Sequence, residues 1–513
     1  MKKFIAIILA GIMLLSLAAC GGGGTKANTV ADNEPLTKDD VIQIATISHA
    51  SWPFREDWKV WQYIEEGCGA TLQVNAYPSS DVVTKYSLML ASPDMLPDIM
   101  CYTSQPNDRY TSQGAFIAFD DMEEYMPNFN AWVDSLSEDE YRNNVANHIA
   151  FDGKIYYSPV IGREKSSGVR AWLYRKDIFE KHNLAVPTNF DELYEVSKKL
   201  KELYPESYPI CLRQGFTHID TSGSSWKEYW ESGLYYDYNA EKWSYGASED
   251  IMLDVLTFCK KMVDEKLMPS NFFTINTTEW QELITTDRGF IMPEYQTRID
   301  FFNGLARVTN PDFDLHAMVP PVANSELGTN KVNKKNVDLS GQVICNNGDE
   351  RRMANAAKYM DWFYTDEAME LVSWGKEGET YEVKDGKKSF ISDESGAQAN
   401  TLYGFSTYGV FTRMDPEAAI VAESADIAET RDMVLEHTMP YANPLNTLSL
   451  NQDEQKVKEE LLTAIGSYKS EMVSKFILGQ EPLSKFAEFQ NELNKMGLSE
   501  LLKVYESAYA RVK

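Results

Sequence analysis

The sequence contains few of the residues on which metal sites and catalysis most often depend. Its six histidines are scattered, with no two within four residues of each other, and this spacing disfavours a histidine metal site. The motifs G-x-S-x-G, H-E-x-x-H and G-x-x-x-x-G-K-S/T are absent, as is the EF-hand calcium pattern. We therefore expect no metal and no cofactor, and no enzyme of these motif classes.

Cysteine is also scarce, with six in 513 residues. Apart from Cys20, an odd number remains: Cys68, Cys101, Cys211, Cys259 and Cys345. No C-x-x-C pair occurs, so the spacing indicates neither a zinc site nor a redox motif. We expect buried free thiols, because a free cysteine packs as a small apolar side chain.

Positive charge is in deficit, since 49 lysines and arginines face 77 aspartates and glutamates, for a net charge of −28. Such a field repels phosphate backbones and argues against a nucleic-acid partner. A mean hydropathy of −0.39 excludes a polytopic membrane protein, and 43% hydrophobic residues suffice for a large core. At roughly 100–200 residues per domain, the length fits about three domain-sized units or two large lobes.

The longest apolar run lies at the N-terminus. Lys2 and Lys3 precede Phe4–Ala19, which as a helix would span about 24 Å, less than the roughly 30 Å of a membrane core. Residues 1–19 are therefore predicted to be a secretory signal peptide rather than a resident membrane helix.

The end of this run looks like a lipobox, Leu17-Ala-Ala-Cys20, in which the chain is cut before Cys20 and that cysteine is acylated. The alternative is an ordinary signal peptide with a chance cysteine. Gly21–Gly24 follow at once and favour the lipobox, since they form a flexible tether. We expect the tether to extend over residues 20–39.

Apolar segments predict a parallel sheet in the first part of the mature chain. Strands are expected at Val41–Ile47, Thr71–Tyr77 and Asp98–Tyr102. Helical faces lie between them, and this order is typical of a parallel sheet with helices on both faces. Ligands bind beyond the carboxyl ends of such strands, so we expect contacts from His49 and Trp52 in the loop Ser48–Trp52, and from the loop Thr103–Tyr110.

A second α/β segment follows, and the chain ends in helices. Its strands are expected at Val169–Tyr174, at Gly289–Met292, ended by Pro293, and at Asp314–Val319. Its helices are expected at Phe190–Leu203, capped by Thr188 or Asn189, at Ile251–Val263 and at about 350–364. Apolar spacings of three and four predict terminal helices around 457–476, 486–493 and 498–509, which we interpret as packing faces.

Aromatic residues are abundant, with 11 Trp, 28 Tyr and 23 Phe. Large apolar walls with few polar anchors suit a reversible small-ligand site, and tryptophan faces stack on the C–H faces of sugar rings. Most tryptophans are expected in the core. Those with loop-like or polar neighbours are candidates for ligand contact, above all Trp52, Trp226, Trp230 and Trp374. Carboxylates are numerous enough that a glycosidase stays an alternative, since sequence gives no distance between two of them.

Short motifs recur in a fixed order along the mature chain. They are Leu90–Asp98, Gly114–Pro127, Asp152–Pro159, Leu173–Asp177, Val186–Leu193, Gly289–Met292, Trp362–Asp366, Trp374–Gly378 and the ending Ile477–Gly479, Met496–Leu498 and Ala508–Tyr509. In this order they resemble the lipoprotein solute-binding components of carbohydrate ABC importers, the extracellular solute-binding family 1 group. The branch resembled most is that of long lipoproteins associated with complex or acidic oligosaccharides, including aldouronate binders.

The resemblance implies a two-lobed α/β fold of the periplasmic-binding-protein type II, in which each lobe is a sheet flanked by helices and a hinge lets them close on ligand. The expected crossings between lobes are near Val160–Arg163, Met318 and Tyr364. The expected lobes are 40–161 with 318–364, and 162–317 with 365–513.

The resemblance also implies ligand contacts. Tyr295 matches the family's site aromatic after the Gly-x-x-Met strand. Asp108-Arg109 matches the pair that holds sugar hydroxyls, with an exposed loop ion pair as the alternative. Arg163 and Glu164 fall at the first crossing, where hinge and ligand roles are both open.

Two further features bear on the site. Trp374 and Glu377 lie in a W-G-x-E-G segment and are candidates for ligand contact, with plain turns at the glycines as the alternative. Alginate-binding relatives carry a calcium loop after the helix that follows the Pro-Thr motif, which is Pro187-Thr188 in this sequence. Here the corresponding region is Leu203–Ile210 and has no such loop. The resemblance therefore implies no calcium.

Together these features predict a lipid-anchored binding protein on the extracytoplasmic face of a bacterial cell membrane. It would capture an oligosaccharide between its lobes and deliver it, as a monomer, to the permease subunits of an ABC importer. The same fold binding a peptide or other organic solute is the main alternative. A surface glycosidase and an adhesin or signalling receptor are others.

Overall fold

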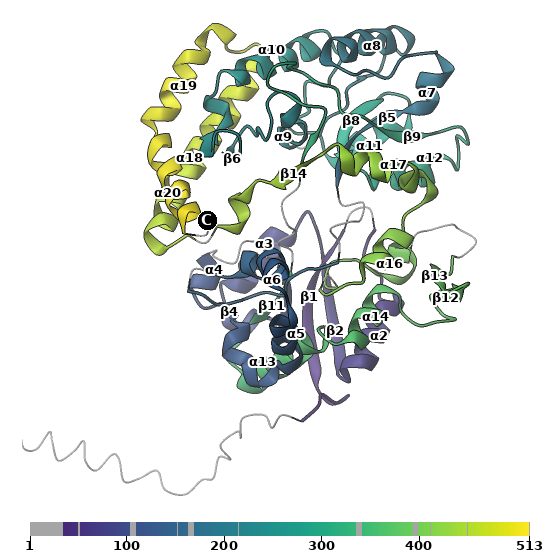
Figure 1. Ribbon diagram of the computed structural model, residues 1–513, viewed down its shortest axis with the longest axis vertical. Coiled ribbons are helices and arrows are strands. Elements are labelled where there is room, and N and C mark those ends of the chain that lie inside the picture. Colours follow the sequence, from purple (N-terminus) through teal and green to yellow (C-terminus); the bar gives the residue numbers. More distant parts are fainter. Residues whose placement is uncertain are drawn as a thin grey trace, which may run out of the picture.

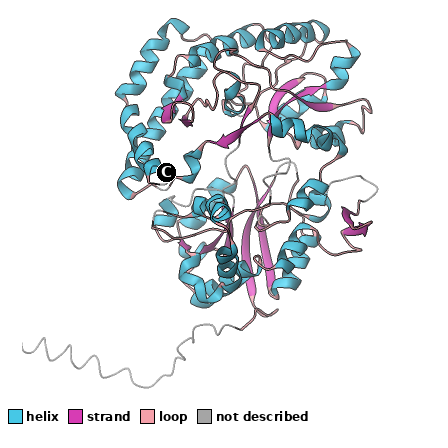
Figure 2. Cartoon of the chain, in the orientation of Figure 1, coloured by secondary structure: helices cyan, strands magenta, loops and turns pink. Residues whose placement is uncertain are grey.

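The computed structural model describes residues 34–49, 52–102, 109–150, 152–162, 169–213, 215–334, 341–392, 399–410, 412–448 and 450–511. These residues form two lobes, one above the other in Figure 1, and each contains both helices and strands (Figure 2). The predicted signal peptide and Cys20 lie outside the described residues. In the part of the chain that is described, no helix combines the length and apolar character needed to cross a membrane.

The first lobe, lower in Figure 1, is built on a five-stranded sheet of order β2-β1-β3-β11-β4. Its strands are β1 (Val41–Ser48), β2 (Thr71–Pro78), β3 (Ile99–Tyr102), β4 (Phe116–Ile117) and β11 (Gly341–Cys345). β1 pairs in parallel with β2 and β3, and the late strand β11 lies antiparallel between β3 and β4. The predicted parallel start is confirmed to within one residue at each strand end.

Helices cover both faces of this sheet. They are α2 (Lys59–Cys68), α3 (Val82–Leu90), α4 (Arg109–Ser112), α5 (Pro127–Ser135), α6 (Glu138–Asn144), α13 (Glu350–Trp362), α14 (Asp366–Ser373), α15 (Ala399–Tyr403) and α16 (Pro416–Val421), with a hairpin of β12 (Tyr381–Lys384) and β13 (Lys387–Phe390). In α2 the helical spacing of Val60, Trp61 and Ile64 buries one face. The helix ends where Gly69 takes a left-handed φ of 82°.

The second lobe contains the antiparallel sheet β8-β5-β9. The strands of this lobe are β5 (Arg170–Arg175), β8 (Ile291–Tyr295) and β9 (Leu315–Met318), with the pairs β6 (Leu234–Asp237) and β7 (Lys242–Tyr245), and β10 (Val332–Lys334) and β14 (Thr438–Ala442). The prediction that Pro293 ends β8 is wrong, because Pro293 lies within the strand opposite Trp172. β8 is the outer strand of this sheet, where a residue without an N–H is tolerated.

The helices of the second lobe include three that end the chain. They are α7 (Lys176–Lys181), α8 (Phe190–Leu203), α9 (Thr217–Thr221), α10 (Ile251–Asp264), α11 (Thr277–Thr285), α12 (Arg298–Ala306), α17 (Ala425–Glu436), α18 (Gln452–Ile477), α19 (Phe486–Lys495) and α20 (Leu498–Ala510). Asn189 is the cap of α8, since its side chain accepts the N–H of Glu192 at 2.9 Å. Ile465, Val473 and Phe476 of α18 share a core with α10, so the predicted packing faces are confirmed.

Short 3-10 helices join these elements: η1 (Pro93–Met95), η2 (Phe119–Tyr125), η3 (Ala146–His148), η4 (Gly223–Ser225), η5 (Gly246–Ser248), η6 (Pro444–Thr447) and η7 (Leu483–Lys485). The five interior cysteines are all free and buried, as predicted.

The tether ends earlier than residue 39. Leu36 packs against the core of the first lobe. The Nζ of Lys38 donates to the carbonyl oxygens of Glu65 at 2.9 Å and Ala70 at 3.1 Å. The chain is therefore part of the folded lobe from Leu36 onward.

The chain segments of the two lobes differ from those expected at two of the three crossings. Met318 and Val332 belong to a core of the second lobe, whereas Val343 and Ile344 belong to the first, so the second crossing falls between residues 332 and 343 and not near Met318. The reason is that β9 pairs with β5 along its whole length.

The third crossing lies well beyond Tyr364. Ala368 and Val372 of α14 are buried in the first lobe's core, where α14 packs against α2. Ala418 of α16 still packs with residues of this lobe, and Ile427 of α17 lies in a core of the second. The crossing therefore falls between α16 and α17, because the apolar face of α14 matches that of α2.

The first crossing runs beside the segment Thr412–Met414, which precedes α16. The N–H of Ile161 donates to the carbonyl of Thr412 at 3.0 Å, and the N–H of Met414 donates back to Ile161 at 3.1 Å. Gly162 follows with a φ of 88°, and a Cβ placed there would lie 2.0 Å from the carbonyl oxygen of Met414. The sequence needs glycine at this point for two reasons, a left-handed backbone and a close approach of two chains.

We expect Gly162→Ala to lower the free energy of unfolding by about 2–5 kcal/mol, from a left-handed backbone penalty and a clash with Met414. Urea unfolding followed by circular dichroism measures this. Gly466→Ala in α18 is the matched control, since its Cβ would meet nothing within 4 Å and helix propensity should make it about 0.5–1 kcal/mol more stable. If Gly162→Ala were as stable as the wild type, the first crossing would not pack this closely on Met414.

Candidate functional site

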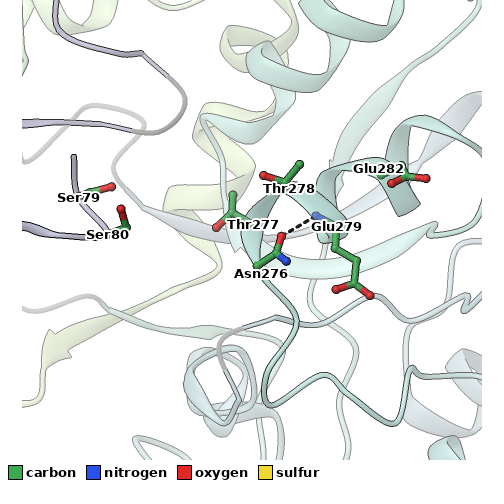
Figure 3. A pocket seen from close by; sticks show the side chains of 7 residues that line it. All are labelled: Ser79, Ser80, Asn276, Thr277, Thr278, Glu279 and Glu282. Carbon is green, nitrogen blue, oxygen red and sulfur yellow. Dashed lines mark hydrogen bonds between the residues drawn. The ribbon is translucent and has the colours of Figure 1, made fainter.

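A cavity of about 690 Å³ lies between the two lobes. Figure 3 shows Ser79 and Ser80 of the first lobe on one side of it and residues of the second lobe opposite. The second lobe contributes Asn276, Thr277, Thr278, Glu279 and Glu282. All seven lining side chains are polar, and together they offer hydroxyl, amide and carboxylate groups to whatever enters.

The strand ends of the first lobe place the serines. β1 and β2 run in register to their last residues, Ser48 and Pro78. The N–H of Ser79 then donates to the carbonyl of Ser48 at 3.0 Å. Ser79 therefore stands beside His49, which follows Ser48, at the carboxyl edge of the sheet where ligands of such folds bind.

The start of α11 places the polar groups opposite. Asn276 caps this helix, and its Oδ1 accepts the N–H of Glu279 at 2.9 Å (Figure 3). Thr277 and Thr278 occupy the first turn that this cap fixes. Glu282, one turn later, accepts a hydrogen bond from Arg288 at 2.6 Å.

A buried charged cluster packs against Trp280 of α11 and is centred on Glu294 of β8, which has no exposed surface. Its Oε2 accepts from the Nε and Nη2 of Arg213 at 2.8 and 2.6 Å. Its Oε1 accepts the backbone N–H of Tyr295 at 2.9 Å, and the Nη1 of Arg170 lies 3.8 Å from the same oxygen.

These charges fix the ionisation of Glu294. Burial by itself raises its pKa, but His218, Arg213 and Arg170 together hold the pKa of Glu294 far below its usual range. The carboxylate is therefore ionised wherever the protein is folded near neutral pH, and it neutralises part of the surrounding positive charge.

His218 is a neutral member of this cluster. The backbone N–H of Arg213 donates to its Nδ1 at 3.3 Å, so the ring proton is on Nε2, which lies 3.2 Å from the Oε2 of Glu294. Burial lowers the pKa of His218 more than the carboxylate of Glu294 raises it. The side chain thus supplies orientation rather than a further charge.

Trp280 of α11 connects the cluster to the cavity. The guanidinium carbons of Arg213 and Arg298 lie 4.7 and 5.9 Å from the centroid of its ring. The Nε1 of Trp280 donates to the carbonyl of Cys211 at 3.1 Å, which holds the fully buried ring in place. The same helix that lines the cavity at its first turn therefore supports two arginines at its second.

The first lobe presents an aromatic pair to this region. The rings of His49 and Trp52 stack with centroids 3.8 Å apart and planes 12° apart. Burial and the charges of Arg298 and Arg213 lower the pKa of His49 to about 4. The two arginines belong to the second lobe, so this effect acts across the interface between lobes and leaves His49 neutral at pH 7.

Tyr295 ends β8 directly opposite Arg170, the first residue of β5. The guanidinium carbon of Arg170 lies 4.2 Å from the centroid of the Tyr295 ring, within cation–π distance. The cavity itself is lined by hydroxyl, amide and carboxylate groups, which can bind the hydroxyl groups of a small polar ligand. Among the described residues, no group of three or more His, Cys, Asp or Glu side chains could hold a metal ion.

The model of a protein family described as "Bacterial extracellular solute-binding protein" matches residues 60–375. The chain belongs to this family. The match covers both lobes and includes every described residue of the cavity and of the charged cluster.

Two curated relatives support this membership. Lipoprotein LipO of Bacillus subtilis is 20% identical over 539 residues, which cover 100% of this chain and 99% of LipO. An uncharacterized ABC transporter extracellular-binding protein of Pyrococcus horikoshii is 26% identical over 216 residues, or 41% of this chain and 47% of that protein.

Solved structures of solute-binding proteins share the fold. Alginate-binding protein AlgQ2, determined without calcium ion, has a TM-score of 0.73 at 21% identity and covers 95% of this chain and 100% of its own. FusA of Streptococcus pneumoniae in complex with kestose has a TM-score of 0.72 at 18% identity, covering 92% and 100%. The N-glycan transport protein NgtS of the same organism has a TM-score of 0.61 at 18% identity, covering 92% and 98%. The predicted two-lobed α/β fold of the solute-binding proteins is confirmed.

Of the residues expected to contact ligand, the structure of this solute-binding protein brings two into contact. His49 and Trp52 stack at the edge of the first lobe, and the charges of Arg298 and Arg213 reach His49. Tyr295 lies beside the charged cluster of the second lobe. Their contact with ligand stays a prediction.

Four further candidates lie at or beyond the edges of the described segments. Asp108, Arg163 and Glu164 lie outside the described residues. Arg109 begins the short helix α4. Their expected roles at the third strand's loop and at the first crossing therefore stay predictions.

Three tryptophans expected at the ligand lie in hydrophobic cores instead. Trp230 and Trp374 have no exposed surface, and Trp226 is 7% exposed. Trp226 packs edge-on against Phe190, and Trp374 stacks on Phe390. These side chains leave no ring face for a sugar.

Glu377 is exposed in the turn between α14 and β12, where its backbone bridges to Tyr381. This turn belongs to the hairpin side of the first lobe, on the right in Figure 1, whereas the cavity residues Ser79 and Ser80 follow β2. The structure therefore does not bring Glu377 together with the cavity residues.

Several functional candidates were missed from the sequence. They are Ser79, Ser80, Arg170, Arg213, His218, Asn276, Thr277, Thr278, Glu279, Glu282, Glu294 and Arg298. For Ser79 and Ser80 a signal existed, since they follow the second parallel strand just as His49 follows the first. Glu294 immediately precedes Tyr295, which the family motif singled out. For Arg213 and Arg298 the sequence offers no comparable signal.

Proposed function

We propose that this protein captures an oligosaccharide between its lobes and delivers it to the permease subunits of an ABC importer. The observation that carries the proposal is the cavity of about 690 Å³ lined by polar side chains from both lobes. A ligand that bonds to both Ser79 and Thr277 stabilises the closed arrangement, because opening breaks one set of contacts.

The chemistry of the lining favours a sugar. Hydroxyl, amide and carboxylate groups can each bond to sugar hydroxyls, and the faces of Trp52 and Tyr295 can pack on the C–H faces of the rings. A peptide ligand would expose backbone groups and varied side chains to a wall in which every side chain carries a polar group. Asp108, Arg109, Arg163 and Glu164 are part of the proposed site, as hydroxyl-binding and hinge-proximal groups.

Relatives of similar fold support the same class of ligand. AlgQ2 is called alginate-binding, FusA was solved with kestose, and NgtS is called an N-glycan transport protein. We extend this from their names to the present chain as a proposal about oligosaccharides in general. The lipoprotein relative LipO also supports cleavage after residue 19, acylation of Cys20 and anchoring to the outer face of the cell membrane.

The test is isothermal titration calorimetry of the purified protein against neutral and uronate-bearing oligosaccharides of two to six units. We expect at least one sugar to bind with a micromolar or lower dissociation constant. We expect Trp52→Ala to weaken that binding about tenfold, which corresponds to about 1.4 kcal/mol. Tyr194→Ala in α8, at the end of the second lobe away from the first, is the aromatic control and should bind normally (Figure 1).

Three outcomes would contradict the proposal. If the protein bound none of these sugars, the proposal that its ligand is a carbohydrate would be wrong. Tighter binding to a peptide library than to any sugar would favour the alternative solute. Release of shorter sugars over time would indicate a glycosidase, and uptake assays in a deletion strain would separate an importer component from an adhesin.

A further inference from the structure

We propose that three tyrosines of the second lobe, Tyr229, Tyr238 and Tyr441, form a platform on which a sugar unit outside the cavity stacks. We call these three residues the tyrosine platform. None of them is among the residues that line the cavity, so the platform is a separate surface. The inference rests on the proposed function, and it adds a second place of contact and a preference for chains long enough to reach it.

The rings of the tyrosine platform leave one face of Tyr441 open. Tyr441 stacks on Tyr238, with centroids 5.1 Å and planes 28° apart, and on Tyr229, with centroids 6.4 Å and planes 23° apart. The rings of Tyr229 and Tyr238 are only 4.8 Å from each other, so both lie on the same side of Tyr441. Tyr441 is 58% exposed, and its outer face is available to a ligand.

The backbone at Tyr229 is strained. Its φ is 63°, in the left-handed region that a bulky side chain rarely adopts. The surrounding structure holds this conformation, because the N–H of Tyr229 donates to the Oγ of Ser224 at 3.0 Å and the same hydroxyl donates to the Oδ1 of Asn333. Strain of this kind concentrates at functional sites, ligand clamps among them. Here it places the Tyr229 ring beside those of Tyr238 and Tyr441.

Hydrogen bonds fix the tyrosine platform where the second crossing begins. The Oη of Tyr238 donates to the carbonyl of Ala442 at 2.8 Å, which ties its ring to β14. β14 pairs with β10, and the Nδ2 of Asn333 in β10 donates to the carbonyls of Asp220 and Trp230 at 2.8 and 2.7 Å. Rings that are held in this way lose little conformational entropy when a ligand stacks on them.

The tyrosine platform lies on the side of the second lobe that faces the first. β14 runs along this side (Figure 1), and β10 leads from it into the second crossing, between residues 332 and 343. β10 also packs against β5, whose first residue, Arg170, lies opposite Tyr295. A sugar chain that extends from the cavity along this side of the lobe therefore meets the platform.

The groups around the tyrosine platform favour a sugar ring over an apolar partner. Glu228 precedes Tyr229 and Asn239 follows Tyr238, and the Nδ2 of Asn239 donates to the Oε2 of Glu228 at 2.9 Å in an exposed pair. A sugar ring has C–H groups on its face and hydroxyls at its edge, so aromatic rings bordered by an amide and a carboxylate match both. An apolar surface would instead remove water from the carboxylate, which is costly.

The experiment measures affinity against chain length by calorimetry at pH 7 with the full mature chain. The probes are cello-, xylo- and fructo-oligosaccharides and oligogalacturonates of two to eight units. In the series that binds, we expect the longest member to bind about tenfold more tightly than the shortest member that binds. Tyr441→Ala should weaken the longest member about tenfold and the shortest less than twofold. Tyr441→Phe keeps the ring face, so it should bind the longest member within threefold of the wild type.

Tyr194→Ala in α8 is the matched control and should leave the affinity for every length unchanged. If circular dichroism shows that Tyr441→Ala does not fold, Tyr441→Leu, which keeps the apolar bulk, makes the same comparison. A wild-type affinity that does not depend on chain length would overturn this inference and leave the proposed function standing. An equal loss for long and short members in the Tyr441 variants, or no loss, would do the same. Binding of no sugar at all would overturn the proposed function itself.

Discussion

Glu294→Gln is expected to lower the free energy of unfolding by about 3–5 kcal/mol, among the largest effects of any single change in the second lobe. The substitution keeps the size of the side chain and removes its charge. Arg213 then loses both charge-assisted bonds to Oε2, at 2.6 and 2.8 Å, while it stays buried. Arg170 loses the one carboxylate within 4 Å among the described residues.

Glu294→Gln should also change how the free energy of unfolding depends on pH below about pH 5. The pKa of Glu294 is lowered on folding, so its contribution is complete above about pH 4.5, the ordinary value for glutamate, and is lost as the pH falls below it. Wild type should therefore lose stability between about pH 5 and 3 more steeply than Glu294→Gln does. Urea unfolding at pH 7, 5 and 3.5 measures both effects.

Glu471→Gln provides the matched control. Glu471 pairs with Lys475 one turn along α18, and its side chain is 60% exposed. Exposed pairs of this kind contribute little, so the control should behave as wild type. If Glu294→Gln and Glu471→Gln proved equally mild at pH 7, Glu294 would not be neutralising buried arginines.

Local sequence signals predicted the elements that place the site. The strand Val41–Ser48 and the helix Phe190–Leu203 were foreseen because their apolar periods, caps and terminal residues agree with each other. In each case the determinants lie within a few residues of the element, so no knowledge of distant partners was needed.

The lobe boundaries needed such knowledge. Nothing in Asp366–Ser373 distinguishes a helix of one lobe from a helix of the other until α2 is known to offer a matching apolar face. The crossing was therefore expected about sixty residues too early, at Tyr364. Packing of one amphipathic helix on another is a tertiary choice that local patterns do not encode.

The tryptophans show why neighbour polarity misled. Trp374 is flanked by glycine, lysine and glutamate, which suggested exposure. Its ring is nevertheless fully buried, because its Nε1 donates to the carboxylate of Asp415 at 2.7 Å and its faces pack on Phe390. Asp415, about forty residues further along the chain, accepts a hydrogen bond from the one polar atom of this side chain, so its burial leaves no donor unpaired. Local sequence does not show that such a distant partner exists.

The charged cluster was equally beyond local reach. Its members stand at positions 170, 213, 218, 294 and 298, on two strands, a loop and two helices. Their meeting depends on the antiparallel register that sets Arg170 opposite Tyr295. Sequence reasoning found Tyr295 through a family motif and stopped one residue short of the carboxylate that organises the cluster.

The free energy of unfolding of the wild-type protein is expected to fall as the pH rises from 5 to 9. Glu231→Gln should remove much of this fall. Burial, and then the charge of Asp220, raise the pKa of Glu231 to about 8, whereas the ordinary value is 4.5. Between these values the folded protein binds a proton that the unfolded chain does not. Stability is therefore full below about pH 4.5 and is lost as the pH rises through 8.

The size of this effect follows from the difference between the two pKa values. It corresponds to at most about 5 kcal/mol above pH 8. We expect about 2–4 kcal/mol, because burial also raises the pKa of Asp220 and the two carboxyl groups titrate together. Glutamine preserves the local contact, since its oxygen can accept the same bond that Asn443 donates to Glu231 at 3.0 Å.

Urea unfolding at pH 5, 7 and 9 tests this expectation. At pH 5 the variant and wild type should agree closely, and at pH 9 the variant should be more stable by about 2–4 kcal/mol. Glu492→Gln, in an exposed pair with Lys495, should follow the wild-type profile throughout. If the free energy of unfolding changed with pH in Glu231→Gln as it does in the wild type, Glu231 would be ionised in the folded state. In that case the positive charge of Lys469 would have to neutralise Glu231 and Asp220 at every pH. Lys469 belongs to α18, and its Nζ donates to the Oγ of Ser232 at 3.0 Å.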